Sequence, residues 1–315
     1  MRWYARLLVG LAAGVLLLCD VSSGPALAAA QPPLGYERWT DPNAESGVDF
    51  GLTPAQVFQK YAASFAPGNV PQTHKRKDKR LIDIEIRADG SGLANYVYDV
   101  VWVEDAGTFK LESWFVPGLT ESELKTLPQL ASQGIAVLDV ERYPDGNSWR
   151  YSVILQRNAG RFGWQVLTDA SYAQVQTTAE RNGLRILDLD YVTHGPNTCP
   201  PPNPTPGQAC QTATFDAILV ADSGSNAVET DLHFNMSAAQ ISQKYAQGYQ
   251  LVDHEGPAAS PYMATVWVKP GLPFMLYPAL TQSEVIFQQG HHGRVIDLER
   301  PGGESKAPYS IVNLP

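Results

Sequence analysis

The stretch Ser171–Asp190, SYAQVQTTAERNGLRILDLD, decides the predicted fold. Ser171 begins a predicted helix, Gly183 ends it, and residues 184–190 form a strand that opens apolar and ends with two acids. The same succession of helix start and acidic strand occurs five times in the 315 residues of the chain. A pattern repeated at this spacing is typical of a repeat array.

Each predicted helix begins with Ser or Thr followed three residues later by Gln or Glu, which is the pattern of a capping box. The hydroxyl accepts a hydrogen bond from a backbone N–H of the first turn, and the longer side chain accepts one from the N–H of the cap residue. Apolar residues before the cap and at the fourth helical position have the spacing of a hydrophobic staple. The five starts are residues 52–57, 119–124, 170–175, 236–241 and 280–285.

Each helix is followed by a short strand that ends with an Asp, one intervening residue and a second acid. Because alternate residues of a strand share a face, we expect the two acids to lie together on one face. We expect the residues that flank each Asp to lie on the other face, under the helix. The strand then emerges from the core at its acidic end. The ten acids are candidate ligand-binding residues: Asp83, Glu85, Asp139, Glu141, Asp188, Asp190, Asp253, Glu255, Asp297 and Glu299.

A second strand, rich in β-branched and aromatic residues, follows each acidic strand. The predicted second strands are residues 96–103, 150–156, 214–220, 262–268 and 308–312. The predicted class is therefore α+β, with five tandem repeats of a helix plus antiparallel strands. These repeats form a curved array, a partial barrel or a closed five-fold ring. The predicted repeats are residues 52–118, 119–169, 170–235, 236–279 and 280–315.

Residues 1–28 have the features of a signal peptide: Arg2 and Arg6, an apolar run over 7–19, and Ala26-Leu27-Ala28 as a cleavage site. The apolar run is shorter than the ~20 residues that a membrane span needs. We therefore expect a secreted or periplasmic protein without a membrane span. Residues 29–51 form a lead, and one hypothesis is that residues 46–51 supply a closing strand that the last repeat lacks.

The net charge of the chain limits the classes of partner that it is expected to bind. Cleavage after residue 28 removes two positive charges and one negative charge, so the formal net charge changes from −9 to −10. An acidic protein of this kind is not expected to bind nucleic acid or anionic membranes in general. The one dense basic run, residues 74–80, predicts either a solvated loop or a contact with an anionic polymer.

Two cysteines remain after processing, Cys199 and Cys210, on either side of a proline-rich segment. In an oxidising compartment we expect them to form a disulfide. The alternative is two free thiols on a loop.

Three segments resemble the bacterial tandem repeat domain: Gly-x-Arg-Ile-Leu-Asp-Leu-Asp at 183–190, Trp-Arg-Tyr-Ser-Val-Ile at 149–154 and Leu-Thr-x-x-Glu-Leu at 119–124. In that family, such repeats precede a serine hydrolase domain, as in the polyglycine hydrolases. The resemblance covers roughly residues 50–315 and implies an architecture more than an activity. This sequence leaves no room for a separate hydrolase domain.

Enzyme motifs are few. Ser122-Glu123-Leu124-Lys125 matches a bare Ser-x-x-Lys pattern, but it falls inside a predicted repeat helix and has no partner motif. We therefore interpret it as structural.

The acid pairs admit three interpretations. In the first interpretation, the acids accept hydrogen bonds from a neighbouring repeat and form ion pairs with arginines. Alternatively, they bind a cation, a basic peptide or a sugar polymer, or they act as the two carboxylates of a glycosidase. Their presence in every repeat favours the structural role. The candidate ion-pair partners are Arg87, Arg142, Arg150, Arg185 and Arg300.

Histidine and tryptophan add no strong site. His254 takes an apolar place beside Asp253, which favours a satisfied histidine over a ligand, and the adjacent His291 and His292 are unsuited to hold one ion together. Trp102 and Trp267 lie in predicted strands, where packing is favoured over a sugar platform. The sequence thus predicts no metal and no cofactor.

The function predicted from the sequence is a non-enzymatic binding or scaffolding protein that recognises an extracellular polymer or protein. The alternative is a secreted hydrolase of peptide or polysaccharide that uses the acidic strand ends or a serine nucleophile.

Overall fold

The computed structural model describes most of the chain beyond residue 44. The described residues are 45–61, 63–64, 79–88, 96–104, 112–157, 162–192, 214–223, 227–234, 236–255, 264–269, 274–292, 294–300 and 309–314. They form small, mainly antiparallel sheets with short helices, so the predicted α+β class is confirmed. No described helix has the length and apolar character needed to cross a membrane.

The described residues contain five sheets with one shared connectivity. In each, an outer strand leads into a helix, an inner strand follows the helix, and a middle strand pairs with both. The first sheet consists of β1 (Ser46–Leu52), β4 (Tyr96–Glu104) and β3 (Lys79–Ala88), with helix α2 (Pro54–Lys60). The second consists of β5 (Ser113–Leu119), β7 (Ser148–Arg157) and β6 (Ile135–Asp145), with α3 (Glu121–Leu124), the 3-10 helix η2 (Leu127–Gln133) and the short strand β2 (Ala63–Ser64).

The other three sheets repeat this order of outer, middle and inner strand. The third consists of β8 (Trp164–Ser171), β10 (Thr214–Ala221) and β9 (Leu184–Val192), with α4 (Tyr172–Asn182). The fourth consists of β11 (Glu229–Phe234), β13 (Ala264–Lys269) and β12 (Gln250–Glu255), with α5 (Ala238–Ala246). The fifth consists of β14 (Met275–Leu280), β16 (Tyr309–Leu314) and β15 (Arg294–Glu299), with α6 (Gln282–His292).

The predicted helix starts are confirmed at all five places. Thr53, Thr120, Ser171 and Ser237 each accept from the backbone N–H three residues on, and each receives a side chain in return. Thr281 makes the same exchange with Glu284. Gly183 adopts the left-handed conformation at the predicted end of its helix, and Gly134 does the same after η2, because a residue without Cβ enters that region without steric cost.

The outer strands belong to the sheet of the helix that follows them. β5 pairs with β7, although the predicted boundaries place residues 113–118 at the end of the preceding repeat. The hypothesis that residues 46–51 complete the last sheet is wrong, because β1 pairs with β4 and the fifth sheet has its own outer strand, β14. β1 nevertheless lies beside the last helix, where Gln289 Nε2 donates to the Ser46 carbonyl over 2.9 Å.

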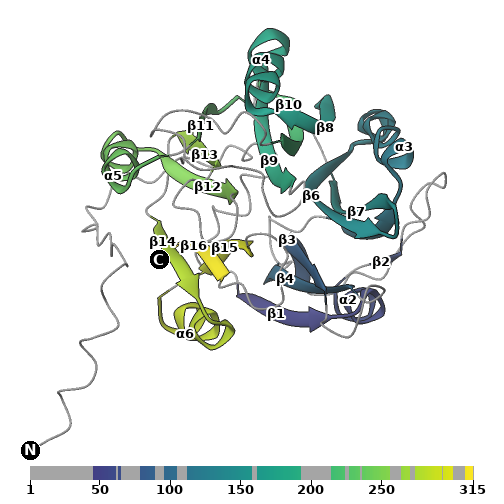
Figure 1. Cartoon of the computed structure of the whole chain (residues 1–315), viewed down its shortest axis with the longest axis horizontal. Coiled ribbons are helices and arrows are strands. Elements are labelled where there is room, and N and C mark those ends of the chain that lie inside the picture. Colours follow the sequence, from purple (N-terminus) through teal and green to yellow (C-terminus); the bar gives the residue numbers. More distant parts are fainter. Residues whose placement is uncertain are drawn as a thin grey trace, which may run out of the picture.

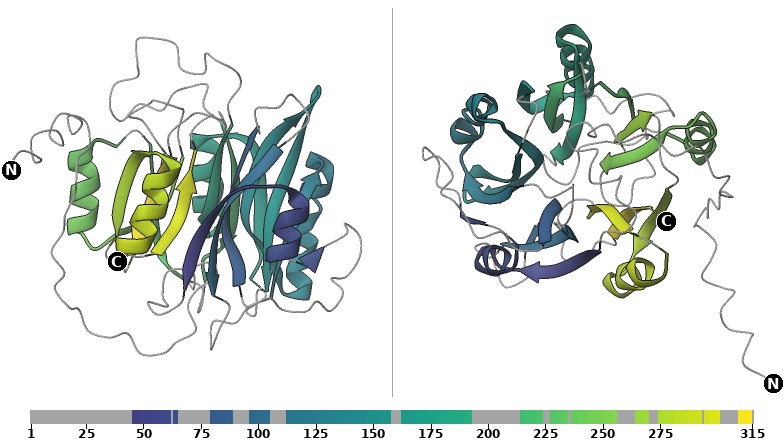
Figure 2. Two further views of the ribbon diagram at one scale, coloured as in Figure 1. Left: turned by 90° about the horizontal axis from the view of Figure 1, so that it is seen from below. Right: turned by 180° about the vertical axis from the view of Figure 1, so that it is seen from behind.

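The five sheets surround a common centre, with their inner strands innermost and the helices outside (Figure 1). The contacts between inner strands run in the cyclic order β3, β6, β9, β12, β15 and back to β3. Figure 2 shows from the side how the sheets stand next to one another. Among the described residues the sheets are separate hydrogen-bonded units. They do not form the predicted partial barrel.

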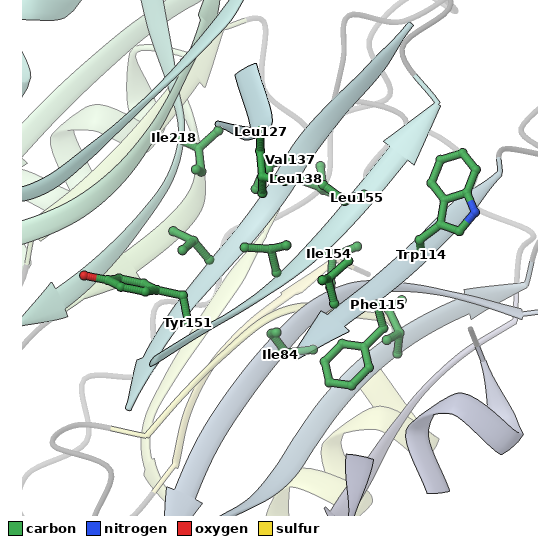
Figure 3. Packing of buried hydrophobic residues seen from close by; sticks show 14 of the residues in the cluster. Ile84, Trp114, Phe115, Leu127, Val137, Leu138, Tyr151, Ile154, Leu155 and Ile218 are labelled. Atoms are coloured by element: carbon green, nitrogen blue, oxygen red, sulfur yellow. The ribbon is translucent and has the colours of Figure 1, made fainter. Parts of the chain in front are cut away.

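Apolar residues fill the spaces between neighbouring sheets. One cluster joins the first, second and third sheets, as Ile84, Phe115, Leu155 and Ile218 show in Figure 3. A second cluster joins the third, fourth and fifth sheets, and a third contains Val101 of the first sheet and Val285 and Ile311 of the fifth. The two ends of the described chain are therefore packed against each other.

Several predictions fall outside the described residues. These are the signal peptide at 1–28, residues 29–44 of the lead, the basic residues 74–78, and the cysteine pair Cys199 and Cys210. The last two residues of the basic run, Lys79 and Arg80, begin β3, where Arg80 is buried and donates to Gln156 over 3.1 Å.

Candidate functional site: the acids of the inner strands

A β-bulge precedes the Asp of every inner strand. The pairing with the middle strand shifts at Ile82, Leu138, Leu187, Val252 and Ile296, each directly before its Asp. A bulge adds one residue to a strand and interrupts the alternation of its side chains. Ile82 therefore packs with the fifth sheet whereas Ile84 packs with the second, and the prediction that both flanking residues share one face is wrong.

All ten candidate acids are buried. Their exposed fractions lie between 1% for Asp139 and 9% for Glu141. The expectation that the strands emerge from the core at their acidic ends is therefore wrong, because the inner strands meet neighbouring sheets at the centre of the molecule.

The first acids of the five pairs, here called the Asp layer, connect neighbouring sheets. In four junctions a carboxylate of the Asp layer accepts the backbone N–H of the residue that follows the Asp of the preceding sheet. The bonds run from Ile84 to Asp139 (2.8 Å), Val140 to Asp188 (2.9 Å), Leu189 to Asp253 (2.8 Å) and Leu298 to Asp83 (2.9 Å). The hydrogen bonds predicted between neighbouring units are confirmed at these four places.

His254 occupies the same position at the remaining junction. Its Nδ1 contacts Asp297, and its Nε2 lies 2.6 Å from the Ser310 hydroxyl. The side chain is 2% exposed, and burial lowers the pKa of His254 to about 4. The prediction of a satisfied histidine is confirmed, although the residue is buried more deeply than expected.

The second acids, here called the second-acid layer, are Glu85, Glu141, Asp190, Glu255 and Glu299. Three of them also accept from the neighbouring backbone: Arg142 N–H to Asp190 (2.9 Å), Tyr191 N–H to Glu255 (3.0 Å) and Arg300 N–H to Glu85. The carboxyl group of Glu299 forms hydrogen bonds with those of Glu85 and Glu255.

Burial raises the pKa of every member of the second-acid layer. The negative charges of neighbouring acids raise the pKa values further, and for Glu141 these neighbours include Asp190, Glu85 and Glu255. Charged carboxylates are costly in a low-dielectric interior unless a positive group or a proton compensates them. The layer therefore favours bound protons or a bound cation.

Three of the five arginines expected to pair with these acids form ion pairs with other aspartates, although Arg142 also lowers the pKa of Asp190. Arg87 Nε lies 2.9 Å from Asp99, Arg142 Nη1 lies 2.8 Å from Asp169, and Arg150 Nε lies 2.9 Å from Asp145. Arg300 also approaches Asp99, at 3.5 Å, and Arg185 is buried in β9.

Two further buried acids lie beside the second-acid layer: Asp99 is paired with Glu85, and Asp216 is paired with Asp190. Neither residue is among the predicted site residues. Both are fully buried on middle strands, and they accept the backbone N–H of Gly51 and Asp169 over 2.7 and 2.9 Å. The available signal is a charged residue in the middle of a β-branched run, as in Tyr-Asp-Val-Val at 98–101.

The remaining candidates have structural surroundings. Ser122 is exposed on α3, and Lys125 pairs with Glu121 rather than with the serine. Trp267 is fully buried, and Trp102 stacks on Tyr61 with a centroid distance of 6.3 Å. The side chains of His291 and His292 lie outside the described part of the structure.

One exposed aromatic surface lies on the hairpin of β6 and β7. Trp149 is 37% exposed, and the Arg142 guanidinium lies 4.2 Å from its ring centroid. Pro144 is paired with Trp149 and is also exposed. We call Arg142, Pro144 and Trp149 the hairpin platform.

No model of a known protein family matches this chain, and no curated protein matches it.

Proposed function

We propose that this protein is an exported, non-enzymatic scaffold that binds an extracellular polymer or protein. The observation that carries the proposal is the hydrogen bonding of the Asp layer. Its carboxylates accept backbone N–H groups of neighbouring sheets inside the protein. Groups bound in this way act as structural supports between sheets.

Such supports favour a rigid body. The bond from Leu298 N–H to Asp83 joins residues 215 positions apart and holds the fifth sheet to the first. A binding surface on a rigid support loses little conformational entropy when it meets its partner. We infer that the five sheets are tandem copies of one unit, related to the bacterial tandem repeat domain.

The hairpin platform is the surface that we assign to the partner. Trp and Arg side chains contribute strongly to binding surfaces because they offer large contact areas and directed polar groups. Arg142 is oriented by Asp169 at 2.8 Å and by Asp216 at 3.6 Å. The Arg142 side chain is itself only 5% exposed and paired with these two aspartates, so it holds the Trp149 ring in place rather than offering a free charge. A flat, exposed ring of this kind suits the apolar face of a sugar in an extracellular polysaccharide.

The test is a co-sedimentation assay with insoluble cell-wall polysaccharides. We expect Trp149→Ala to weaken binding by roughly tenfold without a change in the thermal midpoint. Phe287→Ala, a change at an exposed aromatic on α6, is the matched control and should bind normally. Equal binding by the Trp149→Ala variant and the control would remove the platform from the proposal.

The alternative of a hydrolase that uses the acidic strand ends has less support, because none of the ten acids is more than 9% exposed. A panel of fluorogenic peptide and glycoside substrates tests this alternative directly. Turnover that disappears in the double variant Asp139→Asn/Glu141→Gln, with the fold retained, would overturn the non-enzymatic proposal.

A further inference from the structure

Asp99 and Asp216 occupy the same position on the middle strands of the first and third sheets, where each is paired with the second acid of its sheet. The Oδ2 atom of Asp99 accepts hydrogen bonds from Arg87 Nε over 2.9 Å and from the Tyr309 hydroxyl over 2.6 Å. The Oδ2 atom of Asp216 is buried and has no hydrogen-bond partner among the described residues. Arg142 Nη1 lies 3.6 Å from it, beyond hydrogen-bond distance.

Differences in sequence explain the incomplete surroundings of Asp216. Arg87 follows the second acid of the first sheet by two residues, whereas Val192 takes that place in the third sheet. Tyr151 and Tyr309 hold equivalent positions, because each is paired with the leucine that precedes a helix cap. The Tyr151 hydroxyl nevertheless does not donate to Asp216. Two donors that the first sheet provides are therefore missing here.

Arg142 connects Asp216 to the hairpin platform. Its Nη1 atom lies 2.8 Å from Asp169 and 3.6 Å from Asp216, and its guanidinium carbon lies 4.2 Å from the centroid of the Trp149 ring. Its Nε atom is buried and, within the described part of the chain, also lacks a hydrogen-bond partner. An unused donor and an unused acceptor thus lie in one cluster, so the position of the guanidinium depends on the charge of Asp216.

The surroundings of Asp216 determine when it carries a charge. The titratable and charged groups that face it are Arg142 on β6, Tyr151 on β7, Asp169 on β8 and Asp190 on β9. Helix α4 covers the other face of β10, where Phe215 and Ala217 share its apolar cluster, since alternate residues of a strand point to opposite faces. Burial raises the pKa of Asp216 to about 7, against the opposing effect of Arg142. Asp216 therefore changes its charge near neutral pH, whereas Arg142 stays positive.

We propose that Asp216 is a positioning residue of the hairpin platform, which acts through Arg142 and makes polysaccharide binding sensitive to pH. The ionised carboxylate attracts the guanidinium and holds it against the Trp149 ring. A proton on Asp216 removes this attraction, so that Arg142 keeps its ion pair with Asp169 alone and the ring loses part of its support. The inference rests on the proposed function and predicts tighter binding at pH 8 than at pH 5.5.

The first measurement needs no ligand. The fluorescence of Trp149 is isolated between pH 5 and pH 8.5 by subtracting the spectrum of a Trp149→Phe variant from that of the full-length mature protein. We expect a titration with a midpoint near pH 7, which Asp216→Asn should abolish. Asp231→Asn is the matched control and should keep the titration, because hydrogen bonds outweigh burial and lower the pKa of Asp231 to about 2. A Trp149 signal that does not titrate, or that titrates equally in a folded Asp216→Asn variant, would overturn the inference.

Asp169→Asn keeps the test decisive if Asp216→Asn fails to fold. The Asp169 side chain is 45% exposed, and its backbone has a φ value of 51°, a conformation that Asn adopts readily. The change removes a negative charge that raises the pKa of Asp216 and leaves Arg142 with Asp216 as its ionic partner. The fluorescence midpoint should therefore move to lower pH, and an unchanged midpoint would contradict the inference.

Co-sedimentation with insoluble cell-wall polysaccharides at pH 8 and pH 5.5 is the second measurement. The affinity of the unmodified protein should fall roughly fivefold at the lower pH, whereas Asp216→Asn should bind equally at both. Equal affinity of the unmodified protein at the two pH values would overturn the inference and leave the proposed function intact. Absence of binding at both pH values would instead remove the proposed function, and the fluorescence titration would then decide whether Asp216 acts on Trp149.

Discussion

The Asp layer and the second-acid layer lie two residues apart on the same strands, yet their hydrogen bonding differs: it is regular in the Asp layer and irregular in the second-acid layer. In the Asp layer, four of five junctions contain the same bond from a backbone N–H to a carboxylate, with lengths of 2.8–2.9 Å. In the second-acid layer, Glu85, Asp190 and Glu255 accept backbone N–H groups and Glu299 bonds to other carboxyl groups, whereas burial and the charges of neighbouring acids raise the pKa of Glu141.

The difference teaches that burial of an acid is not by itself a sign of function. A carboxylate that accepts backbone N–H groups stabilises the fold, because the donor compensates for the lost hydration. A carboxylate that faces other carboxylates destabilises the fold until a proton or a cation arrives. Mutation of Asp139, which accepts a backbone N–H, and mutation of Glu141, whose charge neighbouring acids disfavour, should therefore have opposite effects on stability.

The largest effect is expected from Asp139→Ala in the Asp layer. The change leaves the Ile84 N–H buried without an acceptor, which should cost about 3 kcal/mol of unfolding free energy, measured by urea denaturation. Asp139→Asn keeps an acceptor oxygen and should cost about 1 kcal/mol. Equal losses in both variants would show that the charge, rather than the hydrogen bond, carries the contribution.

Asp83→Ala tests the same bond at the junction between the two chain ends. The loss should be about 2 kcal/mol, smaller than for Asp139 because Asp83 is 6% exposed and Asp139 only 1%. Hydrogen exchange in β15 and β16 should accelerate, because Leu298 loses its acceptor. Asp188→Ala is the internal comparison, and unchanged protection of β15 in Asp83→Ala would contradict a role in joining the ends.

Asp216→Asn tests the buried acid behind the second-acid layer. Burial raises the pKa of Asp216 from 3.8 to about 7, so the folded protein binds more protons than the unfolded chain between these values. Stability should therefore fall as pH rises from about 4 to 7, by at most about 1.4 kcal/mol per pH unit. Asp216→Asn should flatten this dependence in denaturation curves, whereas Asp145→Asn at the exposed hairpin should leave it unchanged.

Glu141→Gln should have the smallest effect and the opposite sign. At pH 8, removal of a buried charge that neighbouring acids disfavour should raise the unfolding free energy by about 1 kcal/mol, measured by urea denaturation. The comparison with Asp139→Asn is sharp because the two acids lie two residues apart on β6. A destabilised Glu141→Gln variant would mean that both layers serve the same structural purpose.

Much of the secondary structure follows from the sequence. The caps at Thr53, Thr120 and Ser171 are correctly predicted because each capping box is closed within four residues. The left-handed turn at Gly183 is also predicted correctly, because it depends only on a glycine directly after the helix. The acidic strands and their second strands are also found near the expected positions, since their composition is typical of strands.

Residues with positive φ values precede four of the helix caps, and the sequence indicates this backbone conformation at only some of them. Gly51 and Gly118 lie two residues before their caps with positive φ values of 66° and 79°, as glycine permits. Asp169 and Ala279 adopt the same conformation, with φ values of 51° and 61°, although neither residue type indicates it. Pairing of the outer strand with its middle strand imposes this shape.

The sequence by itself determined the helix starts, the α+β class and the recurrence of acid pairs, because these depend on residues close together in the chain. Only the tertiary structure decided that β1 pairs with β4, that a bulge precedes each Asp and that the ten acids are buried. These features depend on contacts between sheets far apart in sequence, such as Asp83 with Leu298. The energy of a carboxylate is set by the donors and charges around it, and those neighbours are brought together only when the sheets assemble.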